Sequence, residues 1–323
     1  MASQRLINST AELKQAMGAV RTDLKFEAIQ SFVDDAEINH IIPAIGQAQY
    51  DALRETGLDA TQARALALLR KSVSNFTIHY YAAFGAVSID ETGITVLKDD
   101  RRLPASDKKV FQLRTQSRLD GFKALEATVN FLEANRSAFS PYISSQAHTD
   151  NRALFTNTTA DFERGINLRG NSEVFYSLRS TMRMVEENYL EPVLGETVTN
   201  ALRAAILINT LSTDQQQLLQ KIWATVPYLT IGEAIPMRLV EMDGSGLISA
   251  SNKSNSDNIE ELSPGETRKL QAMMNSMLQN GQTQLAKLKK WLNANADKFS
   301  GYTAADIEAL AKLNDEDRSF YFM

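Results

Sequence analysis

The stretch "FLEANRSAFSPY", residues 131–142, and the stretch "WLNANADKFSGY", residues 291–302, follow one pattern. Each begins with an aromatic residue and Leu, passes through Ala-Asn and closes on Phe-Ser-x-Tyr, and the two lie 160 residues apart. We interpret the first residues as the end of the apolar face of a helix, with Phe139 and Tyr142 folding back onto the same domain. The motif is then the structural end of a domain that occurs twice, and not an active site.

The residues upstream of the two motifs also correspond, and they do so in the same order. "EINHIIPAIGQAQYDAL" (37–53) matches "EENYLEPVLGETVTNAL" (186–202) at an offset of 149, and "LLRKS" (68–72) matches "LLQKI" (218–222) at an offset of 150. Chance similarity between amphipathic helices would not preserve this order. The sequence therefore predicts a first domain over 1–150, a second copy of it over 151–305 and a C-terminal tail over 306–323.

Each copy shows the same series of elements. A short helix begins with a capping box, and the following helix ends at a Pro-x-x-Gly turn. A long apolar helix comes next, and then the period changes from 3.6 to 2 around a Gly-bearing turn, which indicates a β-hairpin. The predicted fold class is mainly α: two tandem copies of a helical-bundle domain, each with an inserted β-hairpin. The residues of the repeated turns are Pro43, Gly46, Pro192 and Gly195.

Some local features can be assigned to particular residues. The hairpins are predicted over 86–97 and 237–249. Pro227 lies within the second long apolar helix and is expected to kink it. Ser106 and Ser263 are predicted to cap the final helix of each copy.

The composition is that of a folded protein, since 43% of the 323 residues are apolar and 23% are charged. The net charge of −5 argues against broad nucleic-acid binding, because such binding needs a basic surface. The absence of Cys excludes disulfides, zinc ribbons and cysteine nucleophiles. The first residues, "MASQRLINSTAELKQ", lack the apolar run of a signal peptide, and no apolar window predicts a membrane span. We expect synthesis in a cytoplasm.

No residue pattern predicts catalysis, a metal site or a cofactor site. Asp243 and Ser245 partly resemble a calcium loop, but Leu247 stands where a further ligand is required and the Gly is misplaced. There is no Gly-rich phosphate loop and no GxSxG elbow. The adjacent acids Asp34–Asp35 and Glu186–Glu187 point to different faces of a helix, so we interpret them as solvent-exposed or subunit-contact residues.

The three histidines are His40, His79 and His148. His40 and His79 have no His or Glu partner at a spacing that suits a metal, so they are predicted to act as aromatic residues in the core or at an interface. One functional interpretation of this region is a small-ligand pocket among Phe76, Tyr80 and Tyr81.

The stretch "LKDDRRLPASDKK" (97–109) gathers charges of both signs on a loop after the first hairpin. It is either a solvent-exposed loop or an inter-subunit contact, since arginine binds a carboxylate through two parallel hydrogen bonds. The tail contains the acidic "NDEDR" followed by "SFYFM", whose aromatic residues suggest a peptide that docks on another chain or on the second domain. The candidate interface residues are Asp99, Asp100, Arg101, Arg102, Phe320, Tyr321 and Phe322.

The segments "FVDDAEINHIIPAIGQAQYDAL" and "MVEENYLEPVLGETVTNAL", followed by hairpins and terminal helices, resemble the head–tail connector (head-completion or adaptor) family of tailed phages. The resemblance implies a non-enzymatic subunit of a ring beneath the portal, here in tandemly duplicated form. The implied partners are other copies of the chain, the portal, and tail or neck proteins. Double-stranded DNA would pass through the lumen without specific binding, and an acidic lumen suits that passage. The implied location is the neck of the virion, after synthesis in the host cytoplasm.

An alternative function comes from another class of protein. A cellular helical-repeat adaptor would bind a partner peptide or helix between its two domains. Mass discriminates between the two, because a connector forms a large closed ring or needs its portal to do so, and an adaptor stays monomeric or dimeric.

Overall fold

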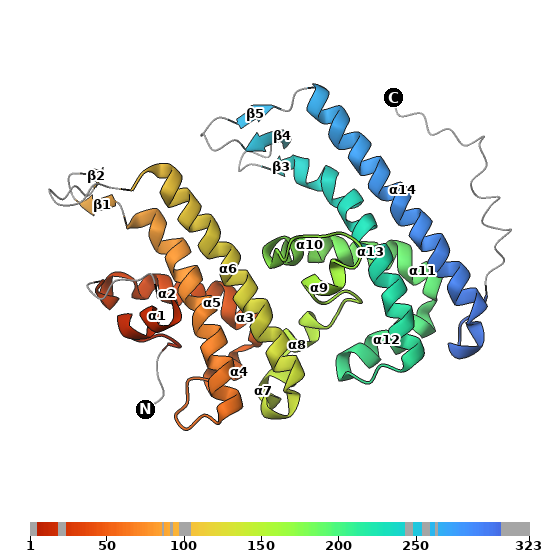
Figure 1. Cartoon of the computed structure of the whole chain (residues 1–323), viewed down its shortest axis with the longest axis horizontal. Helices are drawn as coiled ribbons and strands as arrows, with labels where there is room; N and C mark the ends of the chain where they lie inside the picture. The colour runs from red at the N-terminus through yellow and green to blue at the C-terminus, as the bar shows by residue number, and fades with distance from the viewer. Residues whose placement is uncertain are drawn as a thin grey trace. The chain divides into compact units, whose positions relative to one another are not determined.

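Figure 1 shows the computed structural model of the chain, which is mainly helical. The structure describes residues 5–18, 24–85, 87–90, 93–96, 105–242, 248–253, 259–261 and 264–304. It divides into two compact units. The first unit consists of Met1–Asn151 with Leu168–Tyr176, and the second of Arg152–Asn167 with Ser177–Met323.

The first unit contains short helices followed by one pair of long helices. Its elements are α1 (Thr10–Ala16), η1 (Phe26–Ala28), α2 (Gln30–Ala36), η2 (Glu37–Ile41), α3 (Ile42–Ile45), α4 (Gln47–Ala52), α5 (Ala60–Phe84), β1 (Val87–Asp90), β2 (Gly93–Val96), α6 (Asp107–Ala134), η3 (Arg136–Ala138), α7 (Ser140–Ile143) and α8 (Gln146–Asn151).

The second unit repeats this order. Its elements are α9 (Thr159–Phe162), α10 (Ser172–Val185), η4 (Glu186–Leu190), α11 (Glu191–Leu194), α12 (Glu196–Ile208), α13 (Thr213–Leu239), β3 (Val240–Met242), β4 (Ile248–Lys253), β5 (Ile259–Glu261), α14 (Pro264–Ala294) and η5 (Ala296–Lys298). The start of α10 is assigned to the first unit.

In the first unit α5 and α6 run side by side at the centre of the core (Figure 1). Leu69, Val73 and Phe76 recur at helical spacing along α5 and are fully buried. α6 comes closest at Gly121, where a Cβ atom would lie 2.7 Å from the ring of Phe76. Only glycine allows the two helices this separation.

The pair α13 and α14 repeats the arrangement in the second unit. Ile222, Val226 and Leu229 are fully buried, and a Cβ at Gly281 would lie 2.5 Å from Leu229 Cδ2. The buried positions of α13 follow those of α5 at an offset of 153, so the predicted offset of 150 is wrong here. A shift of three residues is close to one helical turn, so both alignments match apolar residues with apolar residues.

The strands follow the first long helix of each unit. β1 and β2 form an antiparallel pair in which Val87 lies opposite Val96, within the segment 86–97. In the second unit α13 continues to Leu239, and β3, β4 and β5 form a three-stranded antiparallel sheet that extends beyond the predicted segment 237–249. Backbone pairing recruits the polar residues of β4 and β5, which side-chain periodicity does not detect.

The Pro-x-x-Gly turns have the same geometry in both units. Gly46 has φ +81° and Gly195 has φ +77°, a region that other residues rarely adopt. Pro43 and Pro192 lie in the first turn of α3 and α11, directly after the π-helical turns η2 and η4. The helix therefore passes through a wide turn, continues across the proline and ends at the glycine.

The closing motif folds back onto the core, as predicted, although α8 follows it in the first unit. Phe139 and Tyr142 are fully buried, and the rings of Phe131 and Phe139 lie 6.2 Å apart in an edge-to-face contact. Trp291 and Phe299 repeat this contact at 5.9 Å in the second unit. Asparagine ends the long helix in both units, and its side-chain amide donates to the carbonyl four residues earlier.

Two of the local predictions concern helix interiors and caps. α13 runs as one helix through Pro227, against which Gly165 packs so closely that a Cβ there would lie 2.9 Å away. Ser106 stands at the N-cap of α6, as predicted, but its side chain makes no capping hydrogen bond. The residues at this helix start are exposed, so water can satisfy their N–H groups. Ser263 lies outside the described residues.

The glycine contact predicts that Gly281→Ala destabilises the second unit. The added methyl group must displace Leu229, whose backbone nitrogen is 3.1 Å from the new Cβ position, at a cost of about 1–3 kcal/mol. Gly265→Ala is the matched control on α14, because nothing lies within 4 Å of its Cβ position. Urea unfolding followed by tryptophan fluorescence measures both variants, since Trp223 and Trp291 both lie in this unit. Equal stability of the two variants would contradict the close approach.

Candidate functional site

A buried glutamate holds the start of each unit onto its core. The Leu6 N–H donates to Glu37 Oε1 and the Phe155 N–H donates to Glu186 Oε1, each over 2.8 Å. The two glutamates are the first residues of η2 and η4, and their exposed fractions are 2% and 0%. Each carboxylate thus satisfies a buried backbone donor that would otherwise have no partner.

The prediction that the pair Glu186–Glu187 is exposed is wrong for Glu186, whereas Glu187 is exposed. Glu186 lies on the buried face of the helix, and its hydrogen-bond partner, the Phe155 N–H, lies 31 residues upstream. Asp34 is partly exposed and forms an ion pair with Arg5, with 2.5 Å between Oδ1 and Nε.

The second carboxylate oxygen distinguishes the two units. In the first unit the Tyr50 hydroxyl donates to Glu37 Oε2 over 2.5 Å. The corresponding residue of the second unit is Thr199, and Glu186 Oε2 has no hydrogen-bond partner among the described residues. The nearest cation is Arg203, whose Nη2 lies 3.8 Å away. Burial raises the pKa of both glutamates, and that of Glu186 to about 8.

His40 is an aromatic member of a core cluster, as predicted. Its ring stacks on Phe76 at 3.8 Å and meets Phe122 edge-on at 5.4 Å, and its Nε2 lies 2.9 Å from the Tyr80 hydroxyl. Burial lowers the pKa of His40 to about 4, so the ring is neutral at pH 7. Because Phe76 is enclosed by His40 and α6, it does not line the open ligand pocket considered from the sequence.

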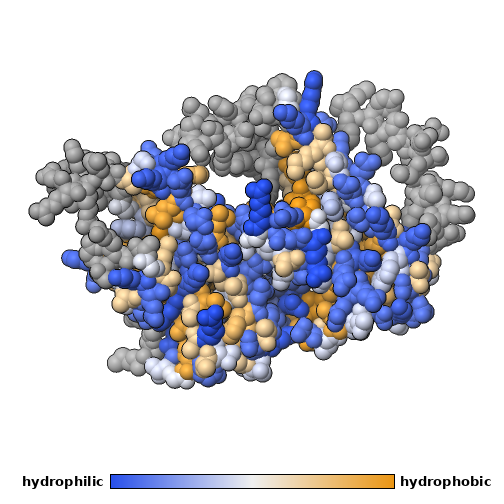
Figure 2. Space-filling view, in the orientation of Figure 1, coloured by the Kyte–Doolittle hydropathy of each residue, from blue (hydrophilic) through white to orange (hydrophobic). Residues whose placement is uncertain are grey.

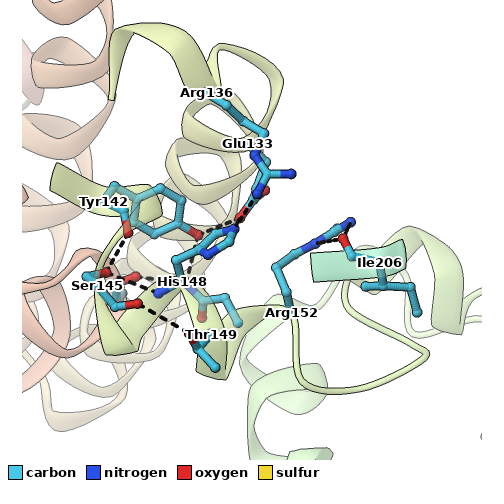
Figure 3. A network of polar contacts seen from close by, with 10 residues as sticks. Glu133, Arg136, Tyr142, Ser145, His148, Thr149, Arg152 and Ile206 are labelled. Carbon is cyan, nitrogen blue, oxygen red and sulfur yellow. Dashed lines mark hydrogen bonds and ion pairs between the residues drawn. The ribbon is translucent and has the colours of Figure 1, made fainter. Parts of the chain in front are cut away.

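His148 lies in a polar network at the end of the first unit (Figure 3). The Tyr142 hydroxyl donates to Glu133 Oε1 over 2.8 Å, and His148 Nε2 lies 3.5 Å from the same oxygen. Arg136 Nη2 is 2.9 Å from His148 Nε2. In the second unit the equivalent tyrosine hydroxyl, that of Tyr302, donates to an asparagine. In both units the tyrosine of the closing motif thus donates to a side chain of the long helix, and the first unit adds His148 and Arg136 to this contact.

The network also contains a serine, but not in the arrangement of a nucleophile and its base. Ser145 Oγ donates to the Tyr142 carbonyl over 2.6 Å and accepts from the His148 backbone N–H over 3.2 Å. Both partners are backbone groups, and a Cβ at Gly46 would lie 2.9 Å from Ser145 Cβ. This serine thus fixes the contact between the closing motif and the Pro-x-x-Gly turn.

Several sequence candidates cannot be placed. The interface candidates at 99–102 and 320–322, and Asp243 with Ser245 of the calcium-like loop, lie outside the described residues. Within the described ranges, no group of three or more His, Asp or Glu side chains could hold a metal ion. No helix there is both long enough and apolar enough to cross a membrane.

Exposed apolar side chains occur at matching positions in the two units, a feature that sequence reasoning missed. We call the end of each long helix pair that adjoins the strands the hairpin end. Phe84 and Met237 near the ends of α5 and α13 are 52% and 51% exposed, at an offset of 153. Leu113 in the second turn of α6 and Met273 in the third turn of α14 are each 46% exposed, at an offset of 160. Figure 2 shows hydrophobic surface at both hairpin ends.

The sequence does contain a signal for these residues. At equivalent positions both copies carry an apolar residue that lies outside the buried face of its helix. The remaining exposed large hydrophobic residues of the described chain have no apolar counterpart of this kind. They are Ile38, Phe111 and Ile208.

The burial of Glu186 predicts a pH dependence of stability. The folded protein binds a proton at Glu186 more tightly than the unfolded chain, whose glutamate has a pKa near 4.5. The contribution of this proton to the free energy of unfolding is fully present below about pH 4.5 and is lost as the pH rises toward 8. Glu186→Gln keeps the acceptor for Phe155 and should flatten the dependence, while Glu187→Gln should not. Urea unfolding at pH 5, 6.5 and 8, followed by tryptophan fluorescence, measures the free energy of unfolding of the unaltered chain and of both variants. The same change of this free energy with pH in all three would contradict the prediction.

The tyrosines of the closing motifs predict a difference between the units. Tyr142→Phe removes the donor to the carboxylate of Glu133, and hydrogen bonds to charged groups are worth about 1.5–3 kcal/mol. Tyr302→Phe removes a donor to the neutral amide of Asn293, worth about 0.5–1.5 kcal/mol. Thermal unfolding by circular dichroism should show the larger loss for Tyr142→Phe. An equal or reversed order would mean that Glu133 does not depend on this donor.

Comparison with known proteins identifies a family for both copies. No curated protein and no solved structure matches the chain significantly. The model of one protein family matches residues 41–152 and, a second time, residues 190–308. The two matches begin 149 residues apart, the same offset that relates Glu37 to Glu186. Because these matches cover most of the chain, the protein belongs to DUF6712, a family of unknown function, and carries two copies of its domain.

Proposed function

We propose that this protein is a structural, non-enzymatic ring subunit of the head–tail connector of a tailed phage or prophage. It would join the portal to the tail in the virion neck, and double-stranded DNA would pass through the lumen. The sequence resemblance motivates the proposal. The observation that carries it is the matching exposed apolar residues at the two hairpin ends.

Packing within a unit accounts for only part of these residues. The Phe84 ring stacks on Phe32 at 5.6 Å, yet about half of Phe84 and half of Met237 stay exposed in the single chain. If one contact repeats from domain to domain around a ring, both copies of the domain in each subunit need the same apolar contact surface. In the proposed assembly each copy also contributes its strands, as an inserted hairpin, to the contact with the next subunit.

The charges of the chain agree with this role. The net charge of −5 suits a passage through which DNA slides without adhering. The loop at 99–102 and the aromatic residues at 320–322 are proposed as further inter-subunit contacts.

The proposal predicts that the purified chain, alone or with its portal, forms a closed multi-subunit ring, seen by native mass measurement and particle imaging. Burying one half-exposed apolar side chain contributes about 1 kcal/mol. The double variant Phe84→Ser, Met237→Ser should therefore weaken each contact by about 2 kcal/mol, or about thirtyfold.

Ile208→Ser is the matched control, because Ile208 is 62% exposed but has the acidic Asp59 as its counterpart in the first copy. Its assembly should equal that of the unaltered chain. A chain that remains monomeric or dimeric at high concentration, both alone and with its portal, would contradict the connector function and favour the helical-repeat adaptor.

A further inference from the structure

A cationic pocket occurs on the surface of the second unit. It has a volume of about 440 Å³ and lies between α13, α14 and the turn after α9. Three of the lining side chains are cations, two are amides, and none is acidic. The lining residues are Arg164, Gln220, Lys221, Ala224, Gln284, Lys287 and Leu288. Three like charges around one pocket, in a chain of net charge −5, indicate a site for an anionic group.

The cations are held in place but are not neutralised by carboxylates of the pocket. The Arg164 guanidinium lies 4.7 Å from the centre of the Trp223 ring, whose indole N–H donates to a backbone carbonyl. Asp161 acts on Arg164 electrostatically, but its carboxylate accepts from Thr158 and does not line the pocket. Among the described residues no carboxylate lies within ion-pair distance of either lysine.

The first unit does not repeat the cationic set. At offsets of 149, 153 and 160, the positions of the three cations are occupied by Gln15, Leu68 and Ala127. The scaffold is the same in both units, so the scaffold does not need these charges. Because the cationic pocket occurs in one copy only, the anionic group that binds there is expected to occur once in the chain as well.

The tail is such an occupant, because its residues beyond 308, where the second family match ends, have no counterpart after the first copy. It carries three consecutive acids, Asp315, Glu316 and Asp317. Ten residues lie between Ala304, where the described chain ends, and Asp315, which makes eleven steps along the chain. They can span up to about 36–40 Å, whereas Lys287 lies only about 10 Å along the helix from the end of α14. The acids can therefore reach the pocket of their own chain.

We propose that the acidic segment Asp315–Asp317 binds in the cationic pocket of its own chain. Binding within one chain is favoured because the short connection gives the segment a high effective concentration at the pocket. The pocket then fixes the position from which the aromatic residues at 320–322 extend. The proposal holds whether or not the chain forms a ring.

Carbodiimide cross-linking of the full chain, followed by peptide mass spectrometry, tests the proposal. An equal mixture of unlabelled and ¹⁵N-labelled chain separates links within one chain from links between chains. We expect residues 315–317 to form links within the chain to Lys221 and Lys287, at about five times the yield of links to Lys290. Lys290 is exposed, lies on α14 and is nearer than Lys287 to the start of the tail, so an undirected tail would react with it at least as often.

Arg164→Gln provides a variant that leaves every reactive amine in place. Removing one cation should lower the yield at Lys221 and Lys287 by about two- to fivefold, the effect of one exposed ion pair. Lys290→Gln is the control and should leave that yield unchanged. Equal yields at all three lysines, links only between chains, or no effect of Arg164→Gln would each overturn the proposal.

Discussion

Each unit depends on the close approach of two long helices at glycine residues, which are Gly121 in the first unit and both Gly232 and Gly281 in the second. At Gly121 the space for a side chain is taken by the ring of Phe76, and at Gly281 it is taken by Leu229. The helix pair carries the strands at one end and the closing motif at the other, and the short helices pack on its side (Figure 1). Interiors are packed too densely to absorb an added methyl group, so this separation fixes where every other element can lie.

The buried glutamates add the second constraint, at a turn whose geometry has its own cause. In η2 and η4 the backbone N–H bonds to the carbonyl five residues earlier, as between Glu191 and Glu186. A proline follows directly in both units, and a proline ring conflicts with the carbonyl four residues before it. The wide turn relieves that conflict, and it places Glu37 and Glu186 where they meet the N-terminal segment of their unit.

The parts of this architecture that the sequence predicts are those set by local patterns. The closing motif, the Pro-x-x-Gly turns and the order of helices depend on special residues and on helical period. The burial of Glu186 escaped prediction because its partner, the Phe155 N–H, is distant in sequence and is a backbone group. The offset between α5 and α13 was wrong by nearly one turn, since such a slip keeps Val73 matched to an apolar residue. Strands β4 and β5 escaped because their pairing is through the backbone.

Comparing the two copies separates what folding needs from what it does not. Features that are shared and buried, such as Gly121 with Gly281, are explained by packing. Features found in one copy, such as the tyrosine that donates to Glu37, show where the copies have diverged. The matching residues of the hairpin ends belong to neither group, because they are shared and yet half exposed. Folding explains the covered half of these side chains, as in the stacking of Phe84 on Phe32, but it does not require an apolar side chain to stay half exposed at the same place in both copies.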